Sequence, residues 1–155
     1  YKTIDIHERI GLFYDSSIGY ESHSGFRYGI CTPYQVFNPT KDRKQKILQL
    51  PPTLMDNHLF GHAHLSKFIS YQDHIDDVLE QVYKYEGIFT VDYHVRVLNV
   101  TFFPEWGDSY EYLLKRINEK GKFYCATPLK IAEHWKERLR IIESNSENES
   151  SCINK

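Results

Sequence analysis

The second half of the chain alternates segments of helical and strand pattern, and this order restricts the fold more than any single segment does. A helix is predicted to follow Ser70, a strand to span residues 87–95 and a second helix to follow Asp108. A short strand is predicted over residues 122–126, and Thr127 with the proline after it predicts the entry of a third helix. Short connections between such segments imply parallel strands joined by right-handed crossovers. The sequence therefore predicts an α/β fold with parallel strands and crossover helices.

The predicted helices carry start and stop signals and apolar residues at helical spacing. Ser70 and Asp73 have the spacing of a capping box, and Asp108 is suited to cap the second helix. Gly87 and Gly121 are predicted to be the left-handed stops of the first two helices. The positions expected to face the core are Ile75, Val78, Leu79, Val82 and Tyr83, then Leu113, Leu114 and Ile117, then Leu129, Ile131, Ala132, Trp135 and Leu139.

Residues 87–95 are predicted to form a buried strand with two titratable groups on one face. Alternation places Asp92 and His94 on one side of this strand. The side expected to pack beneath helices holds Phe89, Val91, Tyr93 and Val95. A carboxylate and an imidazole are costly at a buried strand end unless they are used. Asp92 and His94 are therefore candidate catalytic residues, with Asp92 orienting an imidazole that acts as general acid or base. A purely structural pair is the alternative.

Two earlier strands are predicted over residues 12–15 and 53–56, and each ends in an aspartate. In parallel sheets, functional groups gather at the carboxyl ends of the strands. Asp15 and Asp56 are therefore expected to lie at the same rim as Asp92 and His94. For Asp56, capping of a turn is an equally good interpretation.

Two other groups of residues have functional interpretations. Arg27 lies between two aromatic residues and two glycines, where its guanidinium can hold a carboxylate of the site or bind a substrate oxygen. An exposed arginine without a role is the alternative. His58, His62 and His64 suggest a separate metal site, but no carboxylate stands at ligand spacing, so this hypothesis is the weaker one.

Length and charge limit the domain organisation and the partners. The 155 residues suit a single domain, predicted to span residues 1–142, and the Ser, Asn and Glu of residues 143–155 predict a disordered tail. The net charge of −2 gives no basic field, so a nucleic-acid partner is not expected.

The cysteines and the hydropathy pattern bear on the compartment. Cys31, Cys125 and Cys152 are odd in number and far apart, which favours neither a disulfide framework nor a metal pair and suits a reducing cytoplasm. No apolar run is long enough to span a bilayer, so no membrane association is expected.

Five segments, taken in order, resemble the later half of polysaccharide deacetylase domains. They are residues 14–20 (YDSSIGY), residues 25–29 (GFRYG), Pro33, residues 54–56 (LMD) and residues 88–94 (IFTVDYH). The resemblance covers residues 10–135, nearly the whole predicted domain. It implies a partial (β/α) barrel, of which residues 1–142 are the carboxyl-terminal portion. It also implies a divalent metal, commonly zinc, that assists the removal of an acetyl group from an N-acetylated sugar.

By this resemblance Arg27 matches the arginine that supports the carboxylate base of the family, and His94 matches the histidine that protonates the leaving amine. Asp56 matches the position that tunes this histidine. The family's Asp-Asp pair and His-x-x-x-His motif belong upstream of Tyr14, where this chain has thirteen residues with His7 as their one histidine. The metal ligands are therefore expected outside this chain, and the chain alone is expected to be inactive.

A hypothesis from another class is a carbohydrate-binding or scaffold module with the same fold. Tyr34, Phe103 and Trp106 are the candidate substrate-binding residues, and Tyr20 is a further aromatic residue expected in the cleft. Both hypotheses imply a carbohydrate partner. A partial barrel also leaves a strand edge open to self-association.

Overall fold

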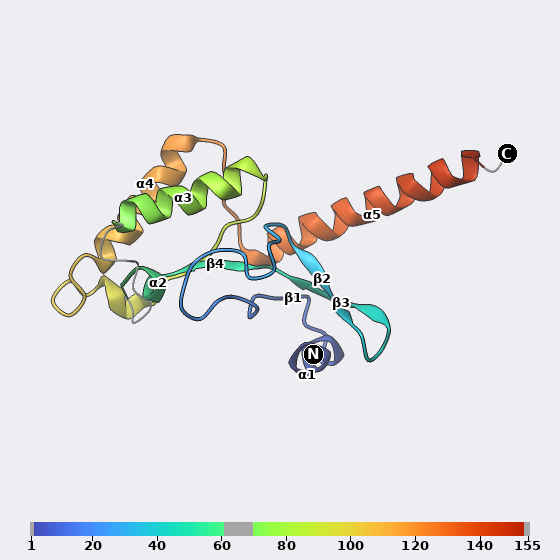
Figure 1. The fold of residues 1–155 in the computed structure, drawn as a ribbon, viewed down its shortest axis with the longest axis horizontal. Coiled ribbons are helices and arrows are strands. Elements are labelled where there is room, and N and C mark those ends of the chain that lie inside the picture. The colour runs from blue at the N-terminus through green and yellow to red at the C-terminus, as the bar shows by residue number, and fades with distance from the viewer. Residues whose placement is uncertain (1, 61–69, 154–155) are drawn as a thin grey trace.

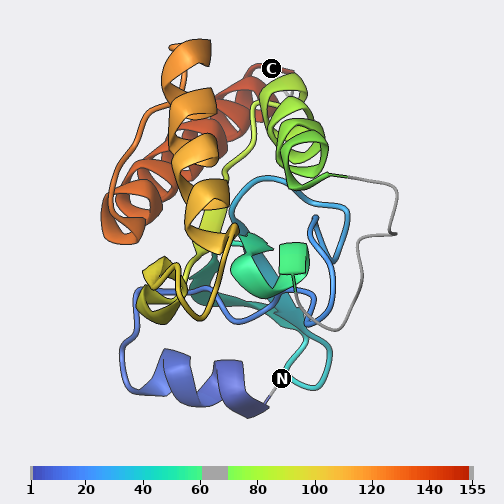
Figure 2. The ribbon, with the colours of Figure 1, turned by 90° about the vertical axis from the view of Figure 1, so that its left-hand side faces the viewer.

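The computed structural model describes residues 2–60 and 70–153, with side chains up to residue 145, and has a mixed α/β architecture. Its elements are α1 (Lys2–Arg9), β1 (Tyr14–Asp15), β2 (Tyr34–Asn38), β3 (Arg43–Gln49), β4 (Pro52–Met55), α2 (Asp56–Phe60), α3 (Tyr71–Lys84), β5 (Thr90–Asp92), the 3-10 helix η1 (Val95–Leu98), α4 (Trp106–Lys120) and α5 (Pro128–Ile153). Figure 1 and Figure 2 show α1 on one side of the strands, and α3, α4 and α5 on the other.

The described strands form two small sheets and no closed barrel. β4 and β5 are parallel neighbours, as the alternation of helix and strand predicts. β1 is parallel to β3 and β2 is antiparallel to β3, so these strands make a separate sheet in the order β1-β3-β2. Asp15 was expected at the same rim as Asp56, Asp92 and His94, but β1, which ends at Asp15, belongs to a different sheet from β4 and β5.

The hairpin of β2 and β3 was not predicted, because polar residues interrupt its alternation. Gln45 and Gln49 are fully buried on β3, on the same face as Ile47. The turn before β3 is set by Asn38, whose side-chain oxygen accepts hydrogen bonds from the backbone N–H groups of Thr40 and Lys41 at 3.0 and 3.2 Å.

Helix α1 was also not predicted, and polar contacts attach it to β3. Ile4 is its one buried residue. Glu8 accepts hydrogen bonds from both terminal nitrogens of Arg43 at 3.0 and 2.8 Å, and this contact lowers the pKa of Glu8 to about 2. Asp5 accepts a hydrogen bond from Gln45 at 2.7 Å. Ion pairs and amide hydrogen bonds therefore hold α1 where most helices use an apolar stripe, and such a stripe is the pattern by which a helix is predicted from sequence.

Helix α3 begins as predicted but ends differently. The hydroxyl oxygen of Ser70 accepts a hydrogen bond from the backbone N–H of Asp73 at 3.1 Å, which confirms Ser70 as the N-cap, and the hydroxyl donates to the Asp73 carboxylate at 2.8 Å. The left-handed residue at the other end is Glu86, with φ 50°, and not Gly87. Gly87 is needed for another reason, because a Cβ there would lie 2.7 Å from the carbonyl oxygen of Cys31.

The ends of α4 and the segment after it also depart in part from prediction. The N-cap is Glu105, with φ 70° and no side-chain hydrogen bond, and Asp108 lies within the first turn. Gly121 is the left-handed C-cap, with φ 62°, as predicted. Residues 122–126 form no strand, because no described strand pairs with them. α5 begins at Pro128, as predicted.

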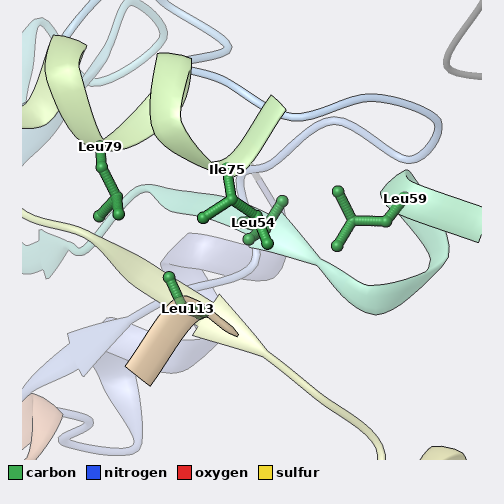
Figure 3. Close-up of a cluster of buried hydrophobic side chains, with 5 residues drawn as sticks. All are labelled: Leu54, Leu59, Ile75, Leu79 and Leu113. Carbon is green, nitrogen blue, oxygen red and sulfur yellow. The ribbon is translucent and has the colours of Figure 1, made fainter. Parts of the chain in front are cut away.

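The larger apolar cluster packs α3 and α4 against β4 and α2. Figure 3 shows its buried side chains, which are Leu54, Leu59, Ile75, Leu79 and Leu113. Phe89 directly precedes β5 in the chain and Tyr93 directly follows it, and both pack against this cluster. A second cluster of Leu48, Leu50 and Ala132 joins the end of β3 to α5, with Trp135 packed against it. Together the two clusters fix the ends of β4 and β5 in place.

Some residues predicted to be in the core are exposed. They are Tyr83, Val91, Val95, Leu114 and Leu129. β5 ends at Asp92 and the chain turns into η1 at Val95, so the alternation of a strand no longer applies there. Val91 lies within β5 and is exposed there, while Tyr83, Leu114 and Leu129 lie at the edges of the apolar stripes of their helices.

Helix α5 continues to Ile153, beyond residue 142, where the domain was predicted to end. Figure 1 shows this helix extending away from the other elements. Its side chains that pack on the second cluster, Ile131, Ala132, Trp135 and Leu139, all precede residue 142. The domain boundary itself stays a prediction.

Two neighbouring leucines test the packing of α4. Leu113 is 1% exposed and Leu114 is 48% exposed. Leu113→Ala is expected to lower the free energy of unfolding by about 2–5 kcal/mol, because it leaves a cavity among well-packed side chains. Leu114→Ala is the matched control, with an expected loss of about 0.5 kcal/mol. Urea denaturation followed by circular dichroism measures both, and equal losses would contradict this packing.

Candidate functional site

The register of β4 and β5 brings the residues that follow these strands together. Met55 is paired with Asp92 in the parallel ladder, so both strands end at the same edge. Asp56 opens α2 directly after β4, and His94 stands two residues after β5. This is the edge where side chains of parallel strands gather for function.

Asp56 and His94 are in direct contact. The Nδ1 atom of His94 lies 3.0 Å from one carboxylate oxygen of Asp56 and 3.1 Å from the other. The carboxylate also accepts hydrogen bonds from the backbone N–H of His94 at 2.8 Å and from that of Asn57 at 2.7 Å. Asp56 is fully buried, whereas the side chain of His94 is 36% exposed. The carboxylate therefore fixes both the backbone and the ring of His94.

The contact also sets which ring nitrogen of His94 is available. A carboxylate accepts hydrogen bonds, so the Nδ1 atom of His94 carries the proton that faces Asp56. The Nε2 atom of His94 has no hydrogen-bond partner among the described residues. An imidazole held in this way can exchange a proton with a ligand at Nε2.

Asp92 does not orient His94, contrary to the interpretation of these two residues as a pair. Asp56 occupies that place, and the side chain of Asp92 is exposed. Asp92 instead lines a cavity of about 810 Å³ beside the strand ends. Other residues on its wall are Ser16, Tyr20, Arg27, Met55 and His58. Asp56 and His94 do not line the cavity, but they follow residues that do. Met55 directly precedes Asp56, and Asp92 stands two residues before His94.

Arg27 lies on this cavity together with Asp92, whereas Asp56 and His94, which were expected at the same rim, are not on its wall. Its Nη1 atom donates a hydrogen bond to the carbonyl oxygen of Gly19 at 2.9 Å. Within residues 2–60 and 70–145 it forms no ion pair with a carboxylate. A Cβ on Gly19 would lie 2.6 Å from the ring of Pro52, so the close approach of this loop to β4 requires glycine.

Asp15 belongs to a second carboxylate–imidazole pair, which the sequence reasoning missed. One oxygen of Asp15 lies 2.7 Å from Nδ1 of His7, and the other accepts hydrogen bonds from Gln49 and from the hydroxyl and N–H of Ser17. Asp15 is buried at the end of β1, and Ser17 lines the cavity. The residue spacing between His7 and Asp15 carries no signal for this contact, because it depends on where α1 packs.

The predicted substrate-binding aromatic residues do not line the cavity. Phe103 packs edge-on against Trp106, and Trp106 stacks on Phe60 at 5.0 Å between ring centroids. Tyr34 begins β2 beside Tyr28, and burial raises its pKa to about 12. Of the four aromatic residues expected in a cleft, Tyr20 is the one on the cavity wall.

His58 is the one member of the candidate histidine metal site that lies among the described residues. Both ring nitrogens of His58 are engaged, since Nδ1 accepts the backbone N–H of Met55 at 3.1 Å and Nε2 faces the carbonyl oxygen of Tyr20 at 3.2 Å. His62 and His64 lie outside the described residues. Among the residues that are described, no three His, Cys, Asp or Glu side chains are placed to hold a metal ion.

Comparisons with known proteins give no assignment. No protein-family model matches the chain, and neither a curated protein nor a solved structure matches it significantly. None of the described helices has the length and apolar composition needed to cross a membrane.

The contact of Asp56 with His94 can be tested through stability. Asp56→Ala is expected to lower the free energy of unfolding by about 3 kcal/mol, because two partly buried backbone N–H groups, those of Asn57 and His94, lose their acceptor. His94→Ala is expected to cost about 1 kcal/mol, since Asp56 keeps its two backbone donors. Urea denaturation of both variants checks this, and an equal cost for the two would argue against a carboxylate that fixes the backbone.

The network around Asp15 predicts a dependence of stability on pH. Burial raises the pKa of Asp15, but hydrogen bonds from Ser17, Gln49 and His7 outweigh it and lower the pKa below its usual value. The stabilisation is present above the unfolded-state pKa of about 4 and is lost as the pH falls through the folded-state pKa. The stability difference between wild type and Asp15→Asn is therefore expected to shrink below about pH 4. Denaturation at several pH values measures it, and a constant difference would contradict the prediction.

Proposed function

We propose that this chain is the carboxyl-terminal portion of a metal-dependent, polysaccharide deacetylase-like hydrolase that removes acetyl groups from an N-acetylated sugar. The observation that carries the proposal is the contact of His94 with the buried carboxylate of Asp56 at the ends of two parallel strands. These are the two residues that the resemblance assigns to the acid and to the group that tunes it. The parallel pair β4 and β5, with helices beside it, is compatible with part of a (β/α) barrel.

The proposed chemistry gives each residue of this chain a separate task. When the amide of the substrate is cleaved, the departing nitrogen needs a proton, and Nε2 of His94 would supply it. Asp56 holds the ring through Nδ1 and so leaves Nε2 available to the leaving group. Arg27 and Asp92, on the neighbouring cavity, would hold the sugar or support the base.

The bound metal would supply a water activated for attack on the amide carbonyl. The resemblance assigns its ligands to a segment upstream of Tyr14, so the residues of this chain act on the leaving group and on substrate position. Zinc is the metal that the resemblance favours. The isolated chain is accordingly expected to be inactive, and its open strand edges are a route to self-association.

A carbohydrate-binding module of the same fold is the second candidate, and it has less support. Its predicted substrate-binding residues, Tyr34, Phe103 and Trp106, do not line the cavity, and of the aromatic residues expected in the cleft only the further one, Tyr20, lies on the described wall. A binding module also has no use for an imidazole that a buried carboxylate orients.

The test is acetate release from an N-acetylated oligosaccharide, with zinc present, by the protein in its natural full length. His94→Ala is expected to lower kcat by roughly 10²–10⁴-fold, because general acid catalysis contributes about that much. His134→Ala is the matched control, since His134 lies exposed on α5 and is expected to leave kcat unchanged. Undiminished turnover in His94→Ala would remove this residue from the mechanism and the proposal with it.

A further inference from the structure

The cavity beside the ends of β4 and β5 has room for a small organic ligand, because sites of that kind measure about 300–1,000 Å³. One part of its wall is apolar and consists of Pro52, Leu54, Met55 and Val91. Such a surface suits a ligand with a hydrocarbon face. The hydrogen-bonding groups on the rest of the wall determine which polar groups that ligand must carry.

The two serines on the wall have already donated their hydroxyl protons. The hydroxyl of Ser16 donates to the carbonyl oxygen of Leu50 at 2.8 Å. The hydroxyl of Ser17 donates to the carboxylate of Asp15 at 2.6 Å. Because a carbonyl and a carboxylate only accept hydrogen bonds, both protons are fixed in these contacts. What each serine oxygen can still offer a ligand is a lone pair, so both act as acceptors.

The imidazole of His58, also on the wall, has no free donor. Its Nδ1 atom accepts the backbone N–H of Met55 at 3.1 Å, and its Nε2 atom faces the carbonyl oxygen of Tyr20 at 3.2 Å. The guanidinium of Arg27 is the main donor that remains. One of its terminal nitrogens already donates to the carbonyl oxygen of Gly19 at 2.9 Å.

Glu21 and Asp92 add two carboxylates to the wall, and both are exposed. Within residues 2–60 and 70–145, neither forms an ion pair. Two carboxylates together with the single guanidinium of Arg27 give this wall a negative charge at neutral pH. A ligand that complements the wall therefore brings hydrogen-bond donors and a positive charge.

We propose that this cavity binds the free ammonium group of an amino sugar, carried by a unit next to the N-acetylated unit that is cleaved. An ammonium group has three donors, no acceptor and a positive charge, so it complements the serine oxygens and the two carboxylates. An acetamido group is neutral, and its carbonyl oxygen needs a donor on a wall where Arg27 is the main one. That a sugar carries the amine rests on the proposed function.

The cavity would then affect the order in which the units of a chain are processed. Removal of an acetyl group creates an amine, which becomes an ammonium group when it is protonated. A product unit held in the cavity would keep the chain bound while the next N-acetylated unit reaches His94. A partly deacetylated chain would therefore be a better substrate than a fully acetylated one.

Isothermal titration calorimetry with the protein in its natural full length tests the proposal. The probes are a glucosamine oligosaccharide and an N-acetylglucosamine oligosaccharide of the same length. The glucosamine form is expected to bind about tenfold more tightly, because hydrogen bonds between charged groups contribute about that much. Raising NaCl from ~0.05 M to ~0.5 M is expected to reduce this preference. Equal affinities, tighter binding of the acetylated form, or a preference that salt leaves unchanged would overturn the inference.

This measurement is independent of turnover, because the glucosamine form has no acetyl group to lose. A protein that releases acetate but does not prefer the amine would overturn this inference alone. A protein that prefers the amine but releases no acetate would contradict the proposed deacetylase and leave the ammonium site supported.

Variants of the two carboxylates locate the binding. Glu21→Gln and Asp92→Asn keep the size of each side chain and remove its charge. Each is expected to weaken binding of the glucosamine form about tenfold and to reduce its preference over the acetylated form. Glu111→Gln is the matched control, since Glu111 is exposed on α4 and is not among the residues described on the wall, and it is expected to bind as wild type does. An unchanged preference in both wall variants would refute the proposal.

Discussion

The buried carboxylate of Asp56 is the interaction on which the arrangement of the site depends. It accepts hydrogen bonds from the backbone of His94, from the ring of His94 and from the backbone of Asn57. These donors come from two segments far apart in the chain, one after β4 and one after β5. A buried acceptor of this kind stabilises the structure only if its donors stay in place, so it fixes the two strand ends against each other.

The apolar packing beneath this contact gives it a rigid base. Leu54 of β4 lies in the same cluster as Ile75 and Leu79 of α3 and Leu113 of α4 (Figure 3). Tyr93, next to His94, packs against that cluster, and burial raises its pKa to about 12. A polar pair at the edge of a packed core keeps its geometry better than one carried on a loop. The His94 ring is therefore oriented before any ligand arrives.

Local sequence signals correctly predicted those features of the fold that depend on residues close together in the chain. The N-cap at Ser70, the stop at Gly121 and the parallel pairing of β4 with β5 follow from spacing and order alone. That pairing also predicted that Asp56 and His94 lie at the same edge of the sheet. The partner of His94 was assigned less well from the strand pattern, since alternation favoured Asp92, and only the resemblance pointed to Asp56. A strand that ends at Asp92 turns His94 toward the neighbouring strand, which periodicity cannot reveal.

Contacts between segments distant in sequence stayed hidden for a different reason. α1 and β3 hold each other through Asp5, Glu8, Arg43 and Gln45, residues whose types predict exposure.

The two carboxylate–imidazole pairs consequently differ in their surroundings. His94 and Asp56 stand on an apolar core, whereas His7 reaches Asp15 from a helix anchored by ion pairs at the surface. Because dissolved salt weakens surface ion pairs far more than apolar packing, ionic strength would loosen one pair and leave the other intact.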